Sequence, residues 1–165
     1  MLKIEGNHLS VEGITFKLPQ NFFIDAEGME TVQPDGLMLI SPEEDCRIAF
    51  MTSEVEFDTP LESLTHIFMD DVLGIGIADD MFSPNETGYI WIEEPQMSEI
   101  NGLKCAYAKY HSKHNYYYEI HFSSINNSDR QLEVLLEIPK ESAIGINDIL
   151  NRQNVKDFYN SFELA

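Results

Sequence analysis

The residues best suited to binding chemistry gather in one predicted β-hairpin in the C-terminal half of the chain. Three lysines, three histidines and five tyrosines lie between positions 104 and 121, although the chain has 10 basic residues in all. Tyrosine is favoured at protein interfaces, so this stretch predicts a surface that recognises another protein or an anionic small ligand. The candidate binding residues are Tyr107, Lys109, His111, His114, Tyr117 and His121.

The same hairpin also has a purely structural interpretation. Successive side chains of a strand point to opposite faces, and tyrosines that face each other across paired strands stabilise a sheet. Lys109 and Glu119 would then form an exposed charge pair across the two strands. The residues alone leave both interpretations open.

Motifs for catalysis or metal binding are missing or incomplete. The chain has no Gly-x-Ser-x-Gly, His-Glu-x-x-His or Cys-x-x-Cys motif. His111 and His114 could converge at a turn, with His121 on the returning strand, but they do not make up a ligand set with metal-site spacing. Cys105 shares a strand face with Leu103, which predicts a buried structural cysteine. We therefore predict no catalytic residue, no cofactor and no resident metal.

The net charge limits the classes of partner. The 165-residue chain has 29 acidic and 10 basic residues, a formal charge of −19. Positions 18 to 103 carry 19 acids and one base, and so hold −18 of that charge. Such a surface repels phosphate backbones and anionic membranes, so we predict no nucleic-acid partner. A cationic protein, a polyamine or a divalent cation remains electrostatically allowed as a partner. The alternative is that the acidic residues only keep the protein soluble.

Alternating apolar and polar residues predict an antiparallel β-sheet. Asn101-Gly102 is a strong signal for a tight hairpin turn, because both residues tolerate positive φ. Four successive strands around this turn predict a meander, and an earlier hairpin is expected across the polar segment 41–45. The expected strands cover residues 2–4, 9–11, 14–18, 22–24, 36–40, 46–57, 89–93, 96–100, 103–110, 116–123 and 131–138.

Two helical segments accompany the strands. Thr59, Pro60 and Glu62 have the types and spacing of an N-terminal cap, which predicts a helix over residues 60–73. Apolar residues from Val155 to Phe162 recur at helical spacing, and the pattern extends upstream to Ile146, either continuously or across a break. The predicted fold class is α+β: one domain over residues 1–165, an antiparallel sheet flanked by helices.

Three stretches resemble PsbP-like proteins, a group that includes Mog and DcrB-type proteins. They are Gly13-Ile-Thr-Phe-Lys-Leu-Pro19 followed by Phe22, Ile100-Asn-Gly-Leu-Lys-Cys-Ala-Tyr107, and Val155-Lys-Asp-Phe-Tyr-Asn-Ser-Phe162. The resemblance implies an α/β/α sandwich, in which the antiparallel sheet lies between helices. It also implies a role in binding or assembly, because better-known members dock to other proteins. It assigns no functional residue.

These observations favour a non-enzymatic domain that docks to an unidentified protein through the tyrosine-rich hairpin, the acidic surface, or both. The alternative is a domain that binds a small ligand or divalent cation in a pocket between sheet and helix. The chain has no secretory signal and no apolar run of membrane-spanning length, which predicts a cytoplasmic protein without membrane insertion. Few arginines and many asparagines and isoleucines are typical of an AT-rich, bacterial genome.

Overall fold

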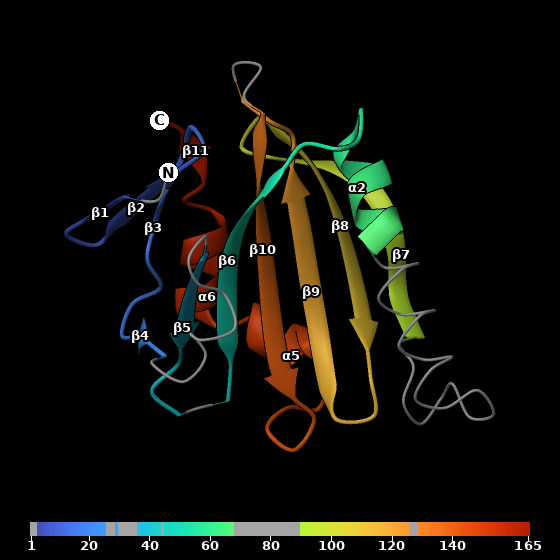
Figure 1. Ribbon diagram of the computed structural model, residues 1–165. Coiled ribbons are helices and arrows are strands. Elements are labelled where there is room, and N and C mark those ends of the chain that lie inside the picture. The colour runs from blue at the N-terminus through green and yellow to red at the C-terminus, as the bar shows by residue number, and fades with distance from the viewer. Residues whose placement is uncertain (1–2, 26–28, 30–35, 44, 68–89, 126–128) are drawn as a thin grey trace.

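A seven-stranded antiparallel sheet forms the centre of the molecule in the computed structural model (Figure 1). The structure describes residues 3–25, 29, 36–43, 45–67, 90–125 and 129–165. The strand order is β4-β5-β6-β10-β9-β8-β7. The strands are β4 (Phe23–Ile24), β5 (Gly36–Ile40), β6 (Arg47–Glu54), β7 (Ile90–Ile100), β8 (Leu103–His111), β9 (Asn115–Phe122) and β10 (Arg130–Pro139).

The predicted meander is confirmed by the pairing of β7, β8, β9 and β10 in chain order. Asn101 and Gly102 form the turn between β7 and β8 with φ values of 51° and 82°. One difference concerns the expected strands 89–93 and 96–100, because residues 90–100 form the single strand β7, while position 89 lies outside the described residues. The register of β7 against β8 shifts on both sides of Glu93. Pro95 is tolerated inside this strand because β7 is the outermost strand of the sheet in the described residues.

The two halves of the chain meet in the middle of the sheet. The hairpin of β5 and β6 was expected, and β6 pairs in turn with β10 over eight residues. This long-range pairing has no local signal in the sequence. A second sheet, in the order β1-β2-β3-β11, combines both ends of the chain. Its strands are β1 (Lys3–Glu5), β2 (His8–Val11), β3 (Ile14–Lys17) and β11 (Glu163–Leu164).

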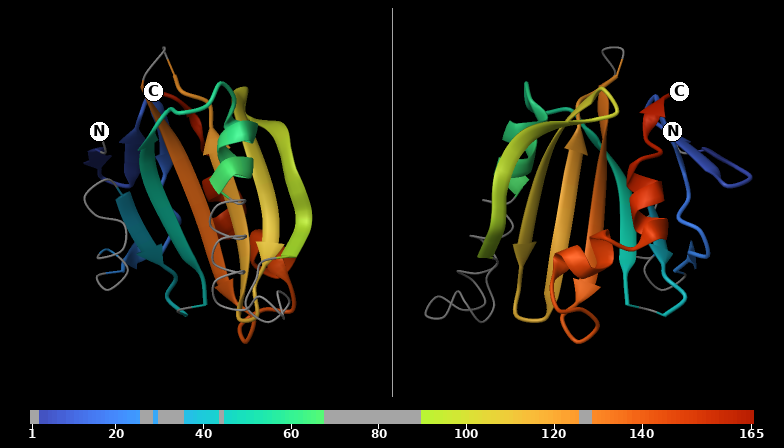
Figure 2. Two further views of the ribbon diagram at one scale, coloured as in Figure 1. Left: turned by 45° about the vertical axis from the view of Figure 1, so that its right-hand side comes forward. Right: turned by 180° about the vertical axis from the view of Figure 1, so that it is seen from behind.

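Helices cover both faces of the large sheet (Figure 2). Helix α2 (Pro60–Ile67) lies on one face, and Thr59 caps it, because its hydroxyl accepts a hydrogen bond from the Glu62 amide at 3.2 Å. The expected continuation over residues 68–73 lies outside the described residues. Helices α5 (Ile146–Leu150) and α6 (Gln153–Tyr159) lie on the opposite face, and the C-terminal pattern is therefore broken between them.

The main core lies between the large sheet, the small sheet and the two C-terminal helices. Phe16 of the small sheet stacks on Phe50 of β6 with ring centroids 4.9 Å apart, and it also meets Phe158 and Phe162. All four phenylalanines are at most 1 % exposed. This aromatic cluster fixes α6 against the sheet. No helix among the described residues is long and apolar enough to cross a membrane.

Candidate functional site

The large sheet divides the six predicted binding residues between its two faces. In the β8–β9 register Lys109 lies opposite Tyr118, and Ala106 lies opposite His121. Alternation therefore places Tyr107, Lys109 and His111 on the face of α5 and α6, and Tyr117 and His121 on the face of α2. The six residues do not form one surface. The expected Lys109–Glu119 pair is wrong as well, because these two side chains point away from each other across the sheet.

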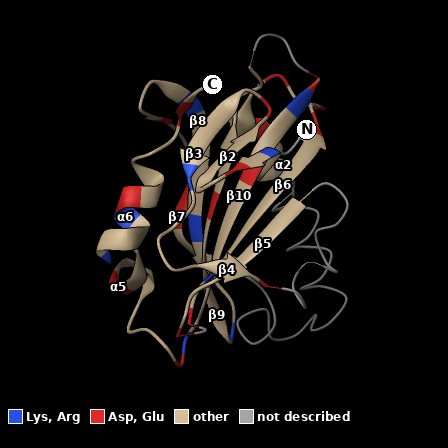
Figure 3. Cartoon of the chain, turned by 90° about the vertical axis from the view of Figure 1, so that its left-hand side faces the viewer, with Lys and Arg blue, Asp and Glu red and all other residues tan. Residues whose placement is uncertain are grey.

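The α5–α6 face carries lysines stacked on tyrosines. The Lys109 ammonium lies 5.6 Å from the centre of the Tyr118 ring, and the Lys140 ammonium lies 5.3 Å from that of Tyr116. Attraction between a cation and an aromatic face holds each lysine in place. Figure 3 shows that α6 adds basic and acidic residues to this side. We call the following set the tyrosine–lysine surface: Tyr107, Lys109, Tyr116, Tyr118, Lys140 and Lys156.

Two depressions lie along the tyrosine–lysine surface. One has a volume of about 310 Å³ and brings Lys109 of β8 and Lys156 of α6 to its walls, together with Tyr107, Tyr118, Leu150, Tyr159 and Asn160. The second, of about 410 Å³, lies between β7 and α5. It is lined by Ile92 and Tyr116 and by the segment 144–148, in which Ile144 is 96 % exposed. Basic, aromatic and apolar groups thus adjoin each other here.

The three histidines of the hairpin do not converge. The imidazole of His111 lies 3.0 Å from the Lys140 ammonium, His114 is exposed at the turn, and His121 is completely buried on the other face. Within the described residues, no group of three or more histidines, cysteines, aspartates and glutamates could hold a metal ion. The histidine-based form of the cation-binding alternative therefore has no support in this geometry.

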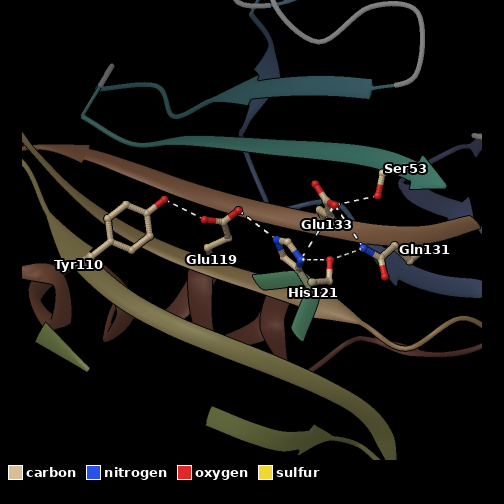
Figure 4. A network of polar contacts seen from close by, with 7 residues as sticks. Ser53, Tyr110, Glu119, His121, Gln131 and Glu133 are labelled. Atoms are coloured by element: carbon tan, nitrogen blue, oxygen red, sulfur yellow. Dashed lines mark hydrogen bonds and ion pairs between the residues drawn. The ribbon is translucent and has the colours of Figure 1, made fainter. Parts of the chain in front are cut away.

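The α2 face holds a buried polar network (Figure 4). It lies where a helix normally packs on a sheet through apolar side chains. We call it the buried network; its members come from β6, α2, β8, β9 and β10. They are Ser53, Ser63, Tyr110, Glu119, His121, Gln131 and Glu133.

His121 is the centre of the buried network. Its Nε2 lies 3.0 Å from Glu119 Oε1, and its Nδ1 lies 3.0 Å from the Ser63 hydroxyl of α2. The Tyr110 hydroxyl donates to the second oxygen of Glu119 at 2.8 Å. On the other side, the Gln131 amide donates to the Ser63 hydroxyl at 2.7 Å. Ser63 thus ties the helix by hydrogen bonds to two neighbouring strands, β9 and β10.

A second carboxylate completes the network. Glu133 accepts hydrogen bonds from Ser53 at 2.7 Å and from Gln131 at 3.3 Å, and lies 3.9 Å from His121 Nδ1. Burial pushes the pKa of His121 downward. The hydrogen bond to Glu119 and the charges of Glu119 and Glu133 outweigh burial and raise the pKa. A protonated His121 compensates part of the buried negative charge.

Ser63, His121 and Glu119 form a hydrogen-bonded chain of the residue types found in serine hydrolases. A nucleophile must reach its substrate, however, and Ser63 is 2 % exposed with its hydroxyl engaged by His121 and Gln131. The arrangement therefore holds α2 on the sheet. Alternation along β9 places Glu119 and His121 on one strand face, but the sequence analysis did not identify their partners. The available signal was the polar pair Gln131 and Glu133, two residues apart in an otherwise apolar strand.

The two cysteines are buried, as predicted for Cys105. Cys105 is 0 % and Cys46 is 1 % exposed. Burial raises the pKa of Cys105 to about 11 and that of Cys46 to about 12, with smaller contributions from nearby acidic residues. Both thiols are protonated at neutral pH and are poor nucleophiles.

Comparison with known proteins identifies the fold. No protein-family model and no curated protein matches the chain. Among solved structures, the chain is similar to cyanobacterial PsbP (CyanoP) from Synechocystis sp. PCC 6803, with a TM-score of 0.57 and 12 % sequence identity. The match covers 100 % of this chain and 92 % of that one. The chain therefore has a PsbP-like α+β fold, as its sequence predicted, and the match bears on the fold alone.

Proposed function

We propose that the protein is a non-enzymatic binding protein that docks an acidic segment of another protein on its tyrosine–lysine surface. The observation that carries the proposal is the pair of lysines held over tyrosine rings, Lys109 on Tyr118 and Lys140 on Tyr116. Although the chain has a net charge of −19, the tyrosine–lysine surface holds basic groups in fixed positions next to the two depressions.

The surroundings of the lysines support a protein partner. Tyrosines present a large apolar area and a polar tip, and they are enriched at interfaces. Ile144 and Ile92 extend the surface with exposed apolar side chains, at 96 % and 45 % exposure. A partner segment with carboxylates next to apolar side chains would match both parts.

The proposal is tested with a charge reversal and a matched control. Lys156→Glu changes the α6 wall of the depression, whereas Lys104→Glu makes the same change on β8 but on the α2 face. A partner captured from cells that produce the protein is identified, purified and titrated by calorimetry. We expect Lys156→Glu to weaken its binding about tenfold, which corresponds to roughly 1.4 kcal/mol, and Lys104→Glu to leave it unchanged. Equal affinities for the two variants would refute the proposal.

A second candidate function, the binding of a small ligand, is favoured by a separate groove. This groove has a volume of about 880 Å³ and lies between the small sheet, the loop after β3, and α6. Its polar lining is rich in amides, with Asn7, Gln20, Asn21, Asn154 and Asn160 from three segments of the chain. Calorimetric titration with calcium and zinc tests whether the groove binds a cation. No heat of binding at millimolar metal would refute cation binding.

A further inference from the structure

Glu93 occupies an unusual position on the outermost strand of the meander. The β7–β8 register shifts between Trp91 and Glu93 and again between Glu93 and Gln96. Irregular pairing on both sides of one residue leaves that residue without a continuous ladder to fix it. The strand at Glu93 can therefore shift at a lower cost than a regular strand.

The side chain of Glu93 is held by two donors of the tyrosine–lysine surface. Its carboxylate lies 3.2 Å from the Lys109 ammonium and accepts a hydrogen bond from the Tyr107 hydroxyl. Burial acts to raise the pKa of Glu93, but the contacts with Tyr107 and Lys109 outweigh it and lower the pKa. The pKa of Tyr107 is raised by burial and by its hydrogen bond to Glu93, as expected for a phenol that donates to a carboxylate.

The same two donors line the depression of about 310 Å³. Tyr107 and Lys109 form its sheet wall, and Lys156 adds a second ammonium group from α6. The Lys109 side chain is 16 % exposed, so its contact with Glu93 is partly shielded, whereas the Glu93 side chain is 38 % exposed. The depression thus contains a carboxylate-binding pair of donors and an additional cation.

We propose that this depression binds the carboxylate of an acidic peptide side chain, and that Glu93 is an internal competitor that holds Tyr107 and Lys109 in the free protein. This inference rests on the proposed function and names the chemical group that the docking surface recognises. An incoming carboxylate takes over the bonds of Glu93 and also meets Lys156. The irregular pairing around Glu93 lets its side chain leave without disrupting the β7–β8 ladder.

The test uses defined peptides and an isosteric variant. An acetylated, amidated tetraglutamate is titrated into isotopically labelled protein at about 0.15 M salt, which screens the remaining charge beyond roughly 8 Å. Dissociation constants come from the NMR shifts of the lysine and tyrosine side chains. Glu93→Gln removes the competing charge at constant size. Glu99→Gln removes the same charge from the same strand at a position paired with Lys104.

We expect Glu93→Gln to bind tetraglutamate about two- to fivefold more tightly than the wild type, the range set by loss of one partly exposed ion pair. Glu99→Gln should bind as the wild type does, tetraglutamine should not bind, and Lys156→Gln should weaken binding. Equal affinities of Glu93→Gln and the wild type, with weaker binding in Lys156→Gln, would refute the competitor and leave the docking surface standing. If the protein binds inorganic phosphate but does not bind tetraglutamate, the peptide carboxylate is not the ligand and the inference is overturned. The titration with the captured partner tests the docking function separately.

Discussion

Replacing His121 by glutamine should destabilise the protein strongly and in a pH-dependent manner. His121 is 0 % exposed and makes hydrogen bonds to Glu119 and Ser63. Glutamine can donate to one of these partners but carries no charge. Glu119, at 7 % exposure, then retains its bond from Tyr110 and loses its cation. Breaking a buried ion pair in this way costs ~3–5 kcal/mol of the free energy of unfolding.

The pH dependence follows from the direction of the pKa shift. The pKa of His121 is raised above the ordinary histidine value of about 6.5 in the folded protein. A raised pKa means that the stabilisation is fully present below the unfolded value and is lost as the pH rises through the folded value. The difference in unfolding free energy between wild type and His121→Gln should therefore be largest near about pH 6 and shrink as the pH rises through the raised pKa of His121.

Urea unfolding followed by tryptophan fluorescence measures this difference. The chain has one tryptophan, and Trp91 packs edge-on against the Tyr110 ring of the buried network at 5.9 Å. His114→Gln is the control, because His114 is exposed at the turn between β8 and β9. A loss below about 1 kcal/mol at pH 6, or a difference that grows with pH, would refute the role assigned to His121.

Two further predictions concern the fold. Phe16→Ala should lower the free energy of unfolding by ~3–5 kcal/mol in urea titrations, since it opens the aromatic cluster against Phe50, whereas the half-exposed Phe23→Ala should cost far less. Gly102→Ala should lower the melting temperature, because φ at this turn is +82° and strain there costs ~1 kcal/mol. Gly145→Ala, at a position with extended backbone and open space, should leave the melting temperature unchanged, and equal effects of the two substitutions would contradict the turn assignment.

Local features of the fold were predictable because nearby residues determine them. The Asn101-Gly102 turn depends on two residues that adopt positive φ, and the start of α2 depends on the Thr59 hydroxyl and the amide three residues later. Asn101 also shows where local reasoning ends. Its side chain donates to the carbonyls of Asn160 and Phe162 at 2.8 and 2.9 Å. This contact links the hairpin to the end of α6 and is invisible in the sequence.

The candidate site was predictable only in part, because it depends on register. Alternation along one strand is enough to place Tyr107 and Lys109 on the same face. Combining them with Tyr117 and His121 in one surface required the two strands to present these residues to the same side. Lys109 lies opposite Tyr118, and a shift of one residue exchanges the faces of a whole strand. Alternation divides the residues of each strand between two faces. It does not say which face of one strand lies on the same side of the sheet as a given face of the next strand.

The division between the two faces also separates two uses of polar chemistry. On the α2 face, Tyr117 stacks on Tyr110 at 4.8 Å and is 9 % exposed, next to the carboxylate and imidazole of the buried network. Groups enclosed in this way satisfy one another, so their loss changes stability. On the α5–α6 face, Lys109 and Lys140 lie over tyrosine rings, and Lys109 also lines the depression of about 310 Å³. A lysine held in place but still partly exposed retains the capacity to meet an external carboxylate. Function is therefore expected on the face where the polar groups are ordered without being enclosed.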